Sequence, residues 1–269
     1  MDTALSGNQQ LDDLIHDAGE VAGYLWQKGW AERNAGNISI DISTLMPSEV
    51  AETDATPCRR LTSPYPAVAG RCYLITGTGK RMRDLPCCPG QHATMIRISK
   101  DGWSYHALGQ DEYCCEPTSE LNSHLGIHQM LRTAGAPQHV VLHTHPNELV
   151  ALTHMKKYQQ ESTLNHLLWS MHPETKIVIP EGIGFVPYNV PGSDAMEVAT
   201  LAALKGRRVV VWEKHGAVAI GADVFEAFDL IDTLNKSVEV FFLCMSAGVE
   251  PDGLTNSQVH ELEVIFHRK

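Results

Sequence analysis

The chain lacks the long apolar runs that a membrane span requires. A spanning helix needs about 20 consecutive apolar residues, and no segment of the 269 residues approaches that length. Residues 1–10 are polar and carry Asp2, so they do not resemble a secretory signal peptide. We therefore expect a cytoplasmic protein without a membrane partner.

Paired cysteines and positive charge are also scarce. The 7 cysteines are odd in number and no two are separated by two residues, which excludes a disulfide framework and a zinc finger. With 21 Lys and Arg against 32 Asp and Glu, the formal net charge is -11. Nucleic acids and anionic membranes require clustered basic residues, so neither is an expected partner. Internal repeats and low-complexity segments are absent.

What the chain does contain is an alternation of helical and strand patterns. Hydrophobic periodicity and capping residues predict helices over 9–31, 119–132, 147–160, 194–206 and 223–246. Alternating or short apolar runs predict strands over 38–42, 71–76, 92–98, 102–107, 140–145, 176–179, 184–188, 208–212 and 217–220. Residues 43–70 contain four prolines and are predicted to form a long surface excursion. The mixture predicts one α/β domain, residues 1–269, in which hairpins outnumber parallel crossovers.

Two histidines on one predicted strand carry the strongest chemical signal. Successive side chains of a strand point to opposite faces, so His143 and His145 share a face. Neutral imidazole is a preferred ligand for zinc and related ions. Pro146 suits the first position of a helix, which would place the pair at the edge of a sheet. The pattern predicts half of a metal site there.

Two further residues are candidates to complete the metal site. His215 follows the apolar strand 209–211 and precedes Gly216, where the backbone can approach a neighbour closely. Glu120 lies in the polar start of a helix for which Thr118 is the predicted N-cap. A carboxylate in a first helical turn is also simply favourable to the helix dipole, so both interpretations of Glu120 stay open.

A rival metal site lies on the same predicted helix. Glu120, His124 and His128 repeat at four-residue spacing, and a histidine pair at that spacing is a known zinc arrangement. Leu125 stands directly after His124, where the metalloprotease motif has glutamate. We therefore favour His124 and His128 as partly buried helix residues.

Three segments have features of phosphate binding. The pair of glycines in 77–79 can leave backbone amides free for an anion, and 118–119 starts a helix, where amides and dipole favour an anion. Residues 34–37 supply two asparagine amides. A Walker motif is absent, so a small phosphate ester is a more suitable ligand than a mononucleotide. The candidate phosphate-binding residues are Asn34, Asn37, Gly77, Thr78, Thr118 and Ser119.

Five segments together resemble a known family. In chain order they match the motifs of zinc-dependent class II sugar-phosphate aldolases, and the resemblance extends from about residue 22 to 247. The segments are 29–37, 76–80, 117–121, 143–145 and 212–216.

The resemblance implies a fold and an activity. The fold would be a three-layer αβα arrangement with a central, mostly antiparallel nine-stranded sheet, assembled as a cyclic homotetramer. The activity would be reversible retro-aldol cleavage of a small-molecule ketose 1-phosphate to dihydroxyacetone phosphate and an aldehyde.

The resemblance also implies roles for individual residues. His143, His145 and His215 would bind one Zn²⁺ per subunit, and Glu120 would be the catalytic carboxylate. Glu174 would be lent to the site of the neighbouring subunit. The remaining implied roles are phosphate binding by Asn34, Gly77, Thr78 and Thr118 or Ser119, and a place near the reacting carbonyl for Asn37.

The chain departs from the family pattern in several places. Thr78 stands where the family often has serine, which keeps the hydroxyl donor. His172 and Pro173 beside Glu174 are unlike the expected sequence. Segments 43–70 and 81–101 match poorly, so loops there could alter the preferred sugar.

Alternative functions leave different sequence signs. Some branches of the superfamily act on L-fuculose 1-phosphate or epimerise L-ribulose 5-phosphate, and they share the three histidines. They tend to place tyrosine near the site, partly from the C-terminus. Residues 264–269 of this chain contain no tyrosine. A Schiff-base aldolase would need a lysine of lowered pKa, for which Lys80 and Lys214 are candidates. A non-catalytic interaction module of the same fold would be expected to lack the metal ligands, and all three are present.

Overall fold

A single large sheet forms the centre of the molecule. The computed structural model describes residues 8–47, 58–108 and 115–267 of the chain. The sheet has nine strands in the order β2-β5-β4-β3-β1-β6-β9-β8-β7. The β7 and β8 pair is parallel and the other neighbouring pairs are antiparallel. The predicted nine-stranded, mostly antiparallel sheet is confirmed.

The elements have the following bounds. The strands are β1 (Asn37–Asp41), β2 (Cys58–Arg60), β3 (Cys72–Thr76), β4 (Ala93–Ile98), β5 (Ser104–Leu108), β6 (Val140–Thr144), β7 (Gly184–Val186), β8 (Val209–Trp212) and β9 (Gly216–Gly221). The α-helices are α1 (Gln9–Gln27), α3 (Pro89–His92), α4 (Leu121–Ala134), α5 (Asn147–Leu152), α6 (Glu161–Met171), α7 (Pro173–Val178), α8 (Asp194–Ala203), α9 (Val224–Ser246) and α10 (Asn256–His267). Short 3-10 helices are η1 (Ser43–Leu45), η2 (Pro66–Val68), η3 (Met82–Asp84) and η4 (Lys156–Tyr158).

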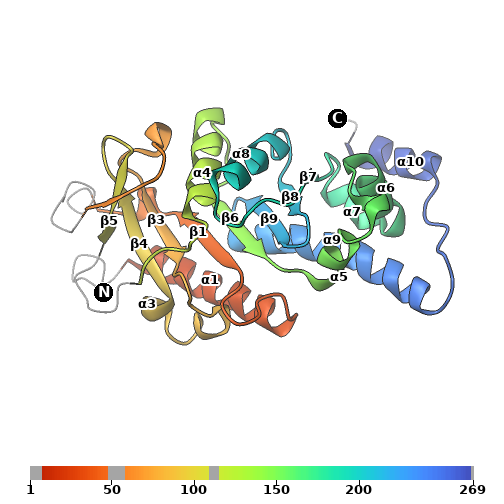
Figure 1. The fold of residues 1–269 in the computed structure, drawn as a ribbon, viewed down its shortest axis with the longest axis horizontal. Coiled ribbons are helices and arrows are strands. Elements are labelled where there is room, and N and C mark those ends of the chain that lie inside the picture. Colours follow the sequence, from red (N-terminus) through yellow and green to blue (C-terminus); the bar gives the residue numbers. More distant parts are fainter. Residues whose placement is uncertain (1–7, 48–57, 109–114, 268–269) are drawn as a thin grey trace.

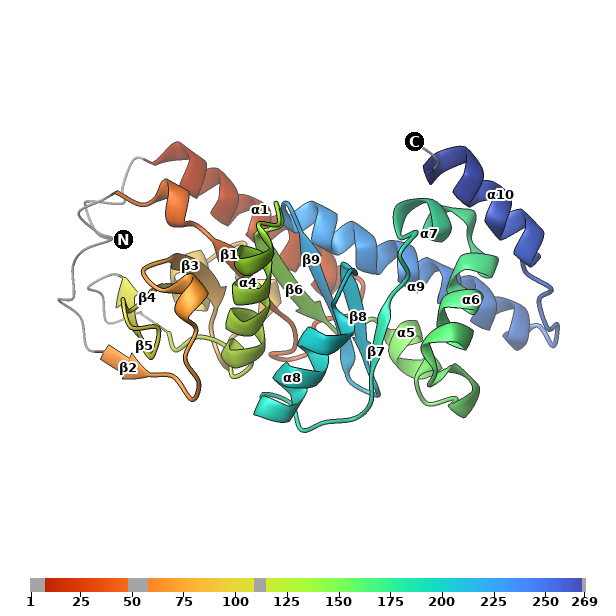
Figure 2. The ribbon, with the colours of Figure 1, turned by 90° about the horizontal axis from the view of Figure 1, so that it is seen from above.

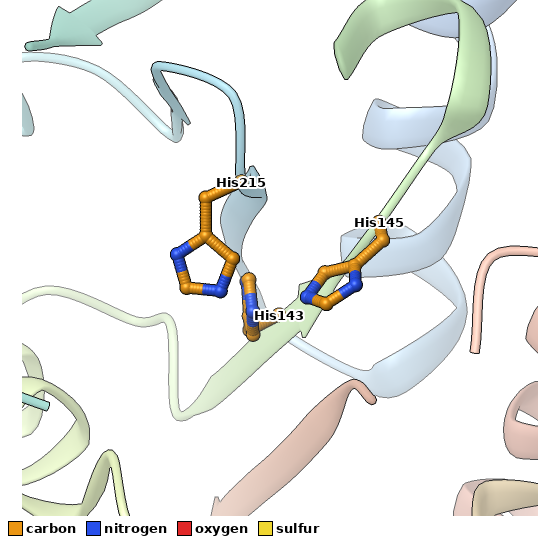
Figure 3. Close-up of side chains that lie close together, drawn as sticks. All are labelled: His143, His145 and His215. Carbon is orange, nitrogen blue, oxygen red and sulfur yellow. The ribbon is translucent and has the colours of Figure 1, made fainter. Parts of the chain in front are cut away.

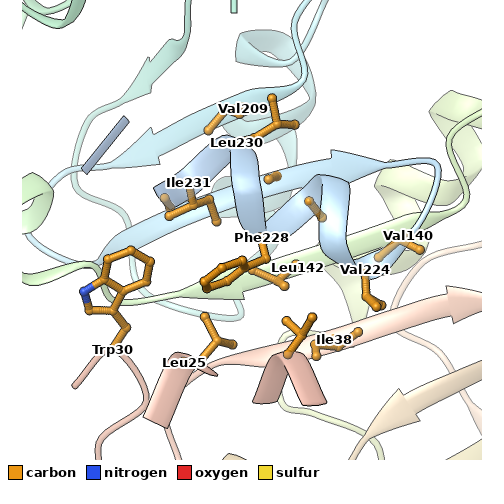
Figure 4. Packing of buried hydrophobic residues seen from close by; sticks show 14 of the residues in the cluster. Leu25, Trp30, Ile38, Val140, Leu142, Val209, Val224, Phe228, Leu230 and Ile231 are labelled. Carbon is orange, nitrogen blue, oxygen red and sulfur yellow. The ribbon is translucent and has the colours of Figure 1, made fainter. Parts of the chain in front are cut away.

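Helices cover both faces of the sheet and give three layers. In Figures 1 and 2, α1 and α9 run along one face while α4 and α8 lie on the other. The alternation along β6 explains the arrangement, because Val140 and Leu142 join the core under α1 and α9, and Val141 joins the core under α4 and α8. Figure 4 shows Leu142 beside Phe228 of α9. His143 continues the side of β6 that faces α4.

Several predicted boundaries needed correction. The helix predicted over 119–132 begins at Leu121, and its N-cap is Glu120 and not Thr118. The helix predicted over 147–160 is interrupted after α5, where the Thr153 hydroxyl donates to the Val150 carbonyl and accepts from the Lys214 amide. This second bond ties the end of α5 to the turn between β8 and β9.

Two segments adopt a different element from the predicted one. Residues 176–179, predicted as a strand from their apolar and β-branched content, lie largely in α7. This helix starts at Pro173, and the hydroxyls of Thr175 and Ser237, 2.7 Å apart, anchor it to α9. Beyond residue 246, where no element was predicted, the chain contains helix α10, whose start is a capping box. The Thr255 backbone amide donates to the side-chain oxygen of Gln258 at 2.9 Å, and the Gln258 backbone amide donates to the Thr255 hydroxyl at 3.3 Å.

The predicted surface excursion over 43–70 is wrong in part. Residues 48–57 lie outside the described residues, but β2 adds an edge strand to the sheet beside β5. Tyr65 and Val68 are buried in a core shared with β3, β4 and α4. The four prolines limit regular structure in this segment without keeping it out of the core.

Among the described residues, helices that combine the length and the apolar character needed to cross a membrane are absent.

Close packing of β7 against α8 makes Gly184 sensitive to substitution. A Cβ at Gly184 would lie 2.5 Å from the Ala203 carbonyl oxygen, which is backbone that cannot move aside cheaply. We expect Gly184→Ala to lower the free energy of unfolding by about 1–3 kcal/mol through overpacking. Urea unfolding followed by circular dichroism measures the change. The control is Gly90→Ala, where the added methyl meets nothing within 4 Å, and an equal loss in both variants would contradict the packing argument.

Candidate active site

The end of β6 places two histidines on the α4 side of the sheet. His143 is buried and stands opposite Asn37 of β1, while His145 follows the strand. The Trp30 carbonyl accepts the Thr144 hydroxyl at 2.8 Å and the His145 amide at 3.0 Å. These two bonds fix the 30–36 loop beside the pair.

A tight turn between β8 and β9 brings the third histidine to the same place. Lys214 has a φ of 59° and starts the return of the chain just before His215. A Cβ at Gly216 would lie 2.4 Å from the Thr144 carbonyl oxygen and 2.9 Å from the rings of His143 and His145. Only glycine allows this approach of β9 to β6, as the sequence pattern predicted.

The three imidazoles form one cluster. Figure 3 shows His143, His145 and His215 turned toward a common centre, and their ligand atoms all lie within 4.8 Å of one another. Among the described residues, this is the cluster of histidine, cysteine and carboxylate groups that could hold a metal ion. The structure thus brings together the three histidines that the sequence pattern singled out.

The hydrogen bonds of the rings suit metal binding. The Nδ1 atom of His143 faces the Ala217 carbonyl oxygen at 2.9 Å, and Nδ1 of His145 faces the Glu32 carboxylate at 2.9 Å. Each Nδ1 therefore carries the proton, which leaves the Nε2 lone pair for an ion. Nδ1 of His215 is buried and has no hydrogen-bond partner among the described residues. The three imidazoles, one of which has a buried Nδ1 without a partner among the described residues, supply a set of nitrogen donors that fits a zinc ion.

Burial keeps the imidazoles of His143 and His215 neutral. Desolvation is the main reason that the pKa of His143 falls to about 3, and neighbouring His145 lowers it further. The pKa of His215 also falls to about 3, first through burial and then through His143. The ring of Trp212 covers both, with centroids 4.6 Å from His143 and 5.0 Å from His215. Neutral rings are the form that binds metal.

A buried carboxylate completes the cluster. Oε2 of Glu120 lies 3.5 Å from Nε2 of His143, and Oε1 lies 3.7 Å from Nε2 of His215. The Asn37 amide donates to Oε2 at 2.8 Å. Glu120 is therefore held beside the ring nitrogens, at the point where α4 begins.

The predicted phosphate segments lie side by side, but one expectation about them is wrong. An isolated bridge pairs Gly77 with Pro117, which brings the 77–79 turn next to the 118–119 segment. The Gly77 amide donates to the His92 carbonyl and the Thr78 amide to the Glu116 carbonyl, both at 2.8 Å. These two amides are not free for an anion, because residue 92 before β4 uses the first and the segment of the bridge uses the second.

The polar groups of this region differ in availability. Thr78 and Ser119 are exposed, whereas Thr118 is buried and its hydroxyl accepts the Glu120 amide at 3.3 Å. Asn34 is exposed on the 30–36 loop. Glu174 lies in the first turn of α7, and among the described residues neither a hydrogen bond nor an ion pair joins it to the three histidines.

The rival helix site does not form. His124 and His128 are buried and bond to side chains of β1, not to a shared vacant centre. Both lie on α4 as expected, but they are fully and not partly buried.

Sequence reasoning missed Glu32 and Trp212. Both fall inside segments that were singled out, yet no spacing rule links Glu32 to a histidine more than a hundred residues away. A carboxylate bonded to the second nitrogen of a metal-binding histidine is a recurrent arrangement, and searching for such partners would have suggested Glu32.

Comparison with known proteins agrees with this geometry. The family model described as Class II Aldolase and Adducin N-terminal domain matches residues 18–242. The chain is 40% identical to the rhamnulose-1-phosphate aldolase of Bacteroides thetaiotaomicron, over 99% of both chains. It is 34% identical to the protein of the same name from Yersinia pestis, over 90% of this chain and 89% of that one.

A solved structure shares the fold as well as the sequence. The crystal structure of a sugar-phosphate aldolase from Thermotoga maritima superposes with a TM-score of 0.78 at 32% identity, covering 91% of this chain and 100% of that one. Sheet, histidine cluster and full-length similarity agree, and we conclude that the chain belongs to the class II aldolase and adducin N-terminal domain family and is an aldolase, a lyase.

Proposed function

We propose that the chain is a zinc-dependent L-rhamnulose-1-phosphate aldolase. It would cleave L-rhamnulose 1-phosphate reversibly to dihydroxyacetone phosphate and L-lactaldehyde, a step of L-rhamnose catabolism in the cytoplasm. The observation that carries the proposal is the cluster of three imidazoles within 4.8 Å, with the Glu120 carboxylate 3.5 and 3.7 Å from two of them. The names of relatives similar over most of the chain support the choice of sugar.

His143, His145 and His215 would hold one Zn²⁺. Three neutral imidazoles leave the full charge on the ion and leave coordination positions open for substrate. When bound, zinc supplies Lewis-acid stabilisation of the negative charge that develops on the ketose fragment, worth several kcal/mol. Glu32 fixes the ring of His145 and Ala217 fixes that of His143.

Glu120 would move the proton at C3 of the ketose fragment. Breaking the C3–C4 bond leaves the electron pair on the fragment that becomes dihydroxyacetone phosphate, and a proton must then be delivered to C3. Glu120 acts as general acid in cleavage and as general base in the aldol direction. Its burial and its bond from Asn37 aim the carboxylate into the histidine cluster.

The phosphate would be held at the junction of the 77–79 turn with the start of α4. Exposed hydroxyls of Thr78 and Ser119 are the available donors there, and the exposed amide of Asn34 would add a third, whereas Gly77 and Thr118 are buried. Holding the phosphate orients the reacting carbons with binding energy from a remote part of the substrate.

The protein would act as a homotetramer. The first turn of α7 carries Glu174, whose carboxylate makes no bond to the site of its own chain among the described residues. A neighbouring subunit would use this carboxylate at the aldehyde oxygen.

Removing one imidazole is expected to remove the metal. We predict that His215→Ala lowers zinc affinity by more than about 100-fold, since even outer partners of metal ligands contribute 10–100-fold, and that aldol cleavage falls with it. Metal analysis after gel filtration and competition with a chromophoric chelator measure the affinity. The control is His16→Ala on the exposed side of α1. Unchanged zinc binding in His215→Ala would refute the proposed ligand set.

Neutralising the carboxylate is expected to stop proton transfer without releasing the metal. Glu120→Gln should lower kcat by roughly 100- to 10,000-fold, the usual contribution of a general acid or base. A coupled assay for dihydroxyacetone phosphate measures the rate. Glu116→Gln changes an exposed carboxylate four residues away and serves as control. A Glu120→Gln enzyme of normal kcat would assign the proton transfer to another group.

The sugar is tested by direct comparison of substrates. We expect L-rhamnulose 1-phosphate to be cleaved with a higher kcat/KM than L-fuculose 1-phosphate, and a chelator to abolish both activities. Release of triose phosphate is the assay. Epimerisation of L-ribulose 5-phosphate without triose release would place the chain in the epimerase branch instead. Activity that survives chelation, together with an intermediate that borohydride traps, would indicate a Schiff base.

A further inference from the structure

A line of buried polar side chains continues behind Glu120, away from the histidine cluster. Asn37 and Ser39 lie two residues apart on β1 and share its α4-facing side, while His124 and His128 lie one turn apart on α4. Their exposed fractions are 7%, 1%, 2% and 3%. Most polar groups buried to this depth have a hydrogen-bond partner.

The bonds form one unbroken chain. Asn37 donates from Nδ2 to Glu120 at 2.8 Å, and Oδ1 of Asn37 lies 2.5 Å from Nε2 of His124. Nδ1 of His124 lies 2.7 Å from the Ser39 hydroxyl, which lies 2.8 Å from Nε2 of His128. Strand and helix side chains therefore alternate along the line.

Donor and acceptor chemistry fixes the direction of the first two bonds. The NH₂ group of Asn37 donates to Oε2 of Glu120, so its amide oxygen is the group that faces His124. An amide oxygen also only accepts, so Nε2 of His124 carries a proton. Burial lowers the pKa of His124 well below its ordinary value, so the ring is neutral and Nδ1 is an acceptor.

The remaining bonds follow in the same direction. The Ser39 hydroxyl donates its hydrogen bond to Nδ1 of His124, so the Ser39 oxygen can only accept from His128. Burial lowers the pKa of His128 to about 4, so this ring is neutral with its proton on Nε2. Every bond points from His128 toward Glu120, and aligned hydrogen bonds polarise and strengthen one another.

We propose that His124 is a positioning residue for the catalytic carboxylate, acting through Asn37, with Ser39 and His128 holding His124 in place. The proposal rests on the proposed function of Glu120 in proton transfer. Because Asn37 is bonded at both ends, its amide cannot rotate without leaving a buried group unpaired. The Glu120 carboxylate is thereby held at one orientation relative to His143 and His215.

Substitutions at His124 separate positioning from simple packing. His124→Leu removes the donor to Asn37, and we expect kcat to fall about 100-fold, the scale of a 1 Å misplacement of a catalytic group, with KM and zinc content unchanged. In His124→Gln the side-chain NH₂ reaches the place of Nε2, so most of kcat should return. In His124→Asn the NH₂ reaches only the place of Nδ1, and kcat should stay low.

Two matched measurements complete the experiment. Ser123→Ala removes a buried hydroxyl on the same helix that has no partner among the described residues, and kcat should be unchanged. Deuterium exchange at C3 of dihydroxyacetone phosphate, followed by NMR, isolates the step assigned to Glu120 and should fall by the same factor as kcat in His124→Leu.

The outcomes distinguish this proposal from the proposed function. Aldol cleavage by the wild type supports the proposed function whatever His124 does, whereas equal kcat in the Leu, Gln and Asn variants would overturn the positioning role. Nitrogen-15 NMR of the wild type should show the Nε2-protonated tautomer at both His124 and His128. The Nδ1-protonated tautomer at His124 would overturn the proposal even in a protein that proved to have no aldolase activity.

Discussion

The approach of β9 to β6 is the constraint on which the site depends. Antiparallel pairing of Thr144 with Ala217 places the end of β6 beside the start of β9. Because Gly216 has no side chain, the two backbones approach to a distance that a Cβ would forbid. The turn before it then delivers His215 to the pair on β6. Without this approach the third imidazole would stand apart, and two histidines alone would make an incomplete site.

The same sheet geometry organises the charge around the cluster. Burial keeps the imidazoles of His143 and His215 neutral. The carboxylate of Glu120 lies near their Nε2 atoms, and that of Glu32 lies at Nδ1 of His145. Glu120 is buried and held by Asn37, whereas Glu32 is exposed and bonded to His145. Glu120 is thus placed to face substrate, and Glu32 is placed to orient a metal-binding histidine.

The sequence could predict whatever depends on local periodicity or on a compact motif. Strand alternation put His143 and His145 on one face, and helical spacing found α9 almost to the residue and the start of α1, which ends at Gln27 and not at the predicted residue 31. Periodicity failed where tertiary contacts decide the element, as at α7, which the hydroxyl of Ser237 helps to hold. The capping box of α10 was a local signal that could have been used.

Long-range side-chain partners were beyond prediction. Asn37 and Glu120 are 83 residues apart, and the bond between them depends on how α4 packs across β1. The amides of Gly77 and Thr78 resembled a free anion-binding turn in the sequence, yet a neighbouring segment uses them. A motif indicates which groups are present, and packing decides which of them are still available for a ligand.

The most direct test of the central claim is X-ray absorption at the zinc edge of the metal-loaded protein. Binding by His143, His145 and His215 predicts three imidazole nitrogens at about 2.0–2.1 Å, with oxygen in the remaining coordination sphere. Sulfur at about 2.3 Å, or fewer than three imidazoles around the ion, would contradict it.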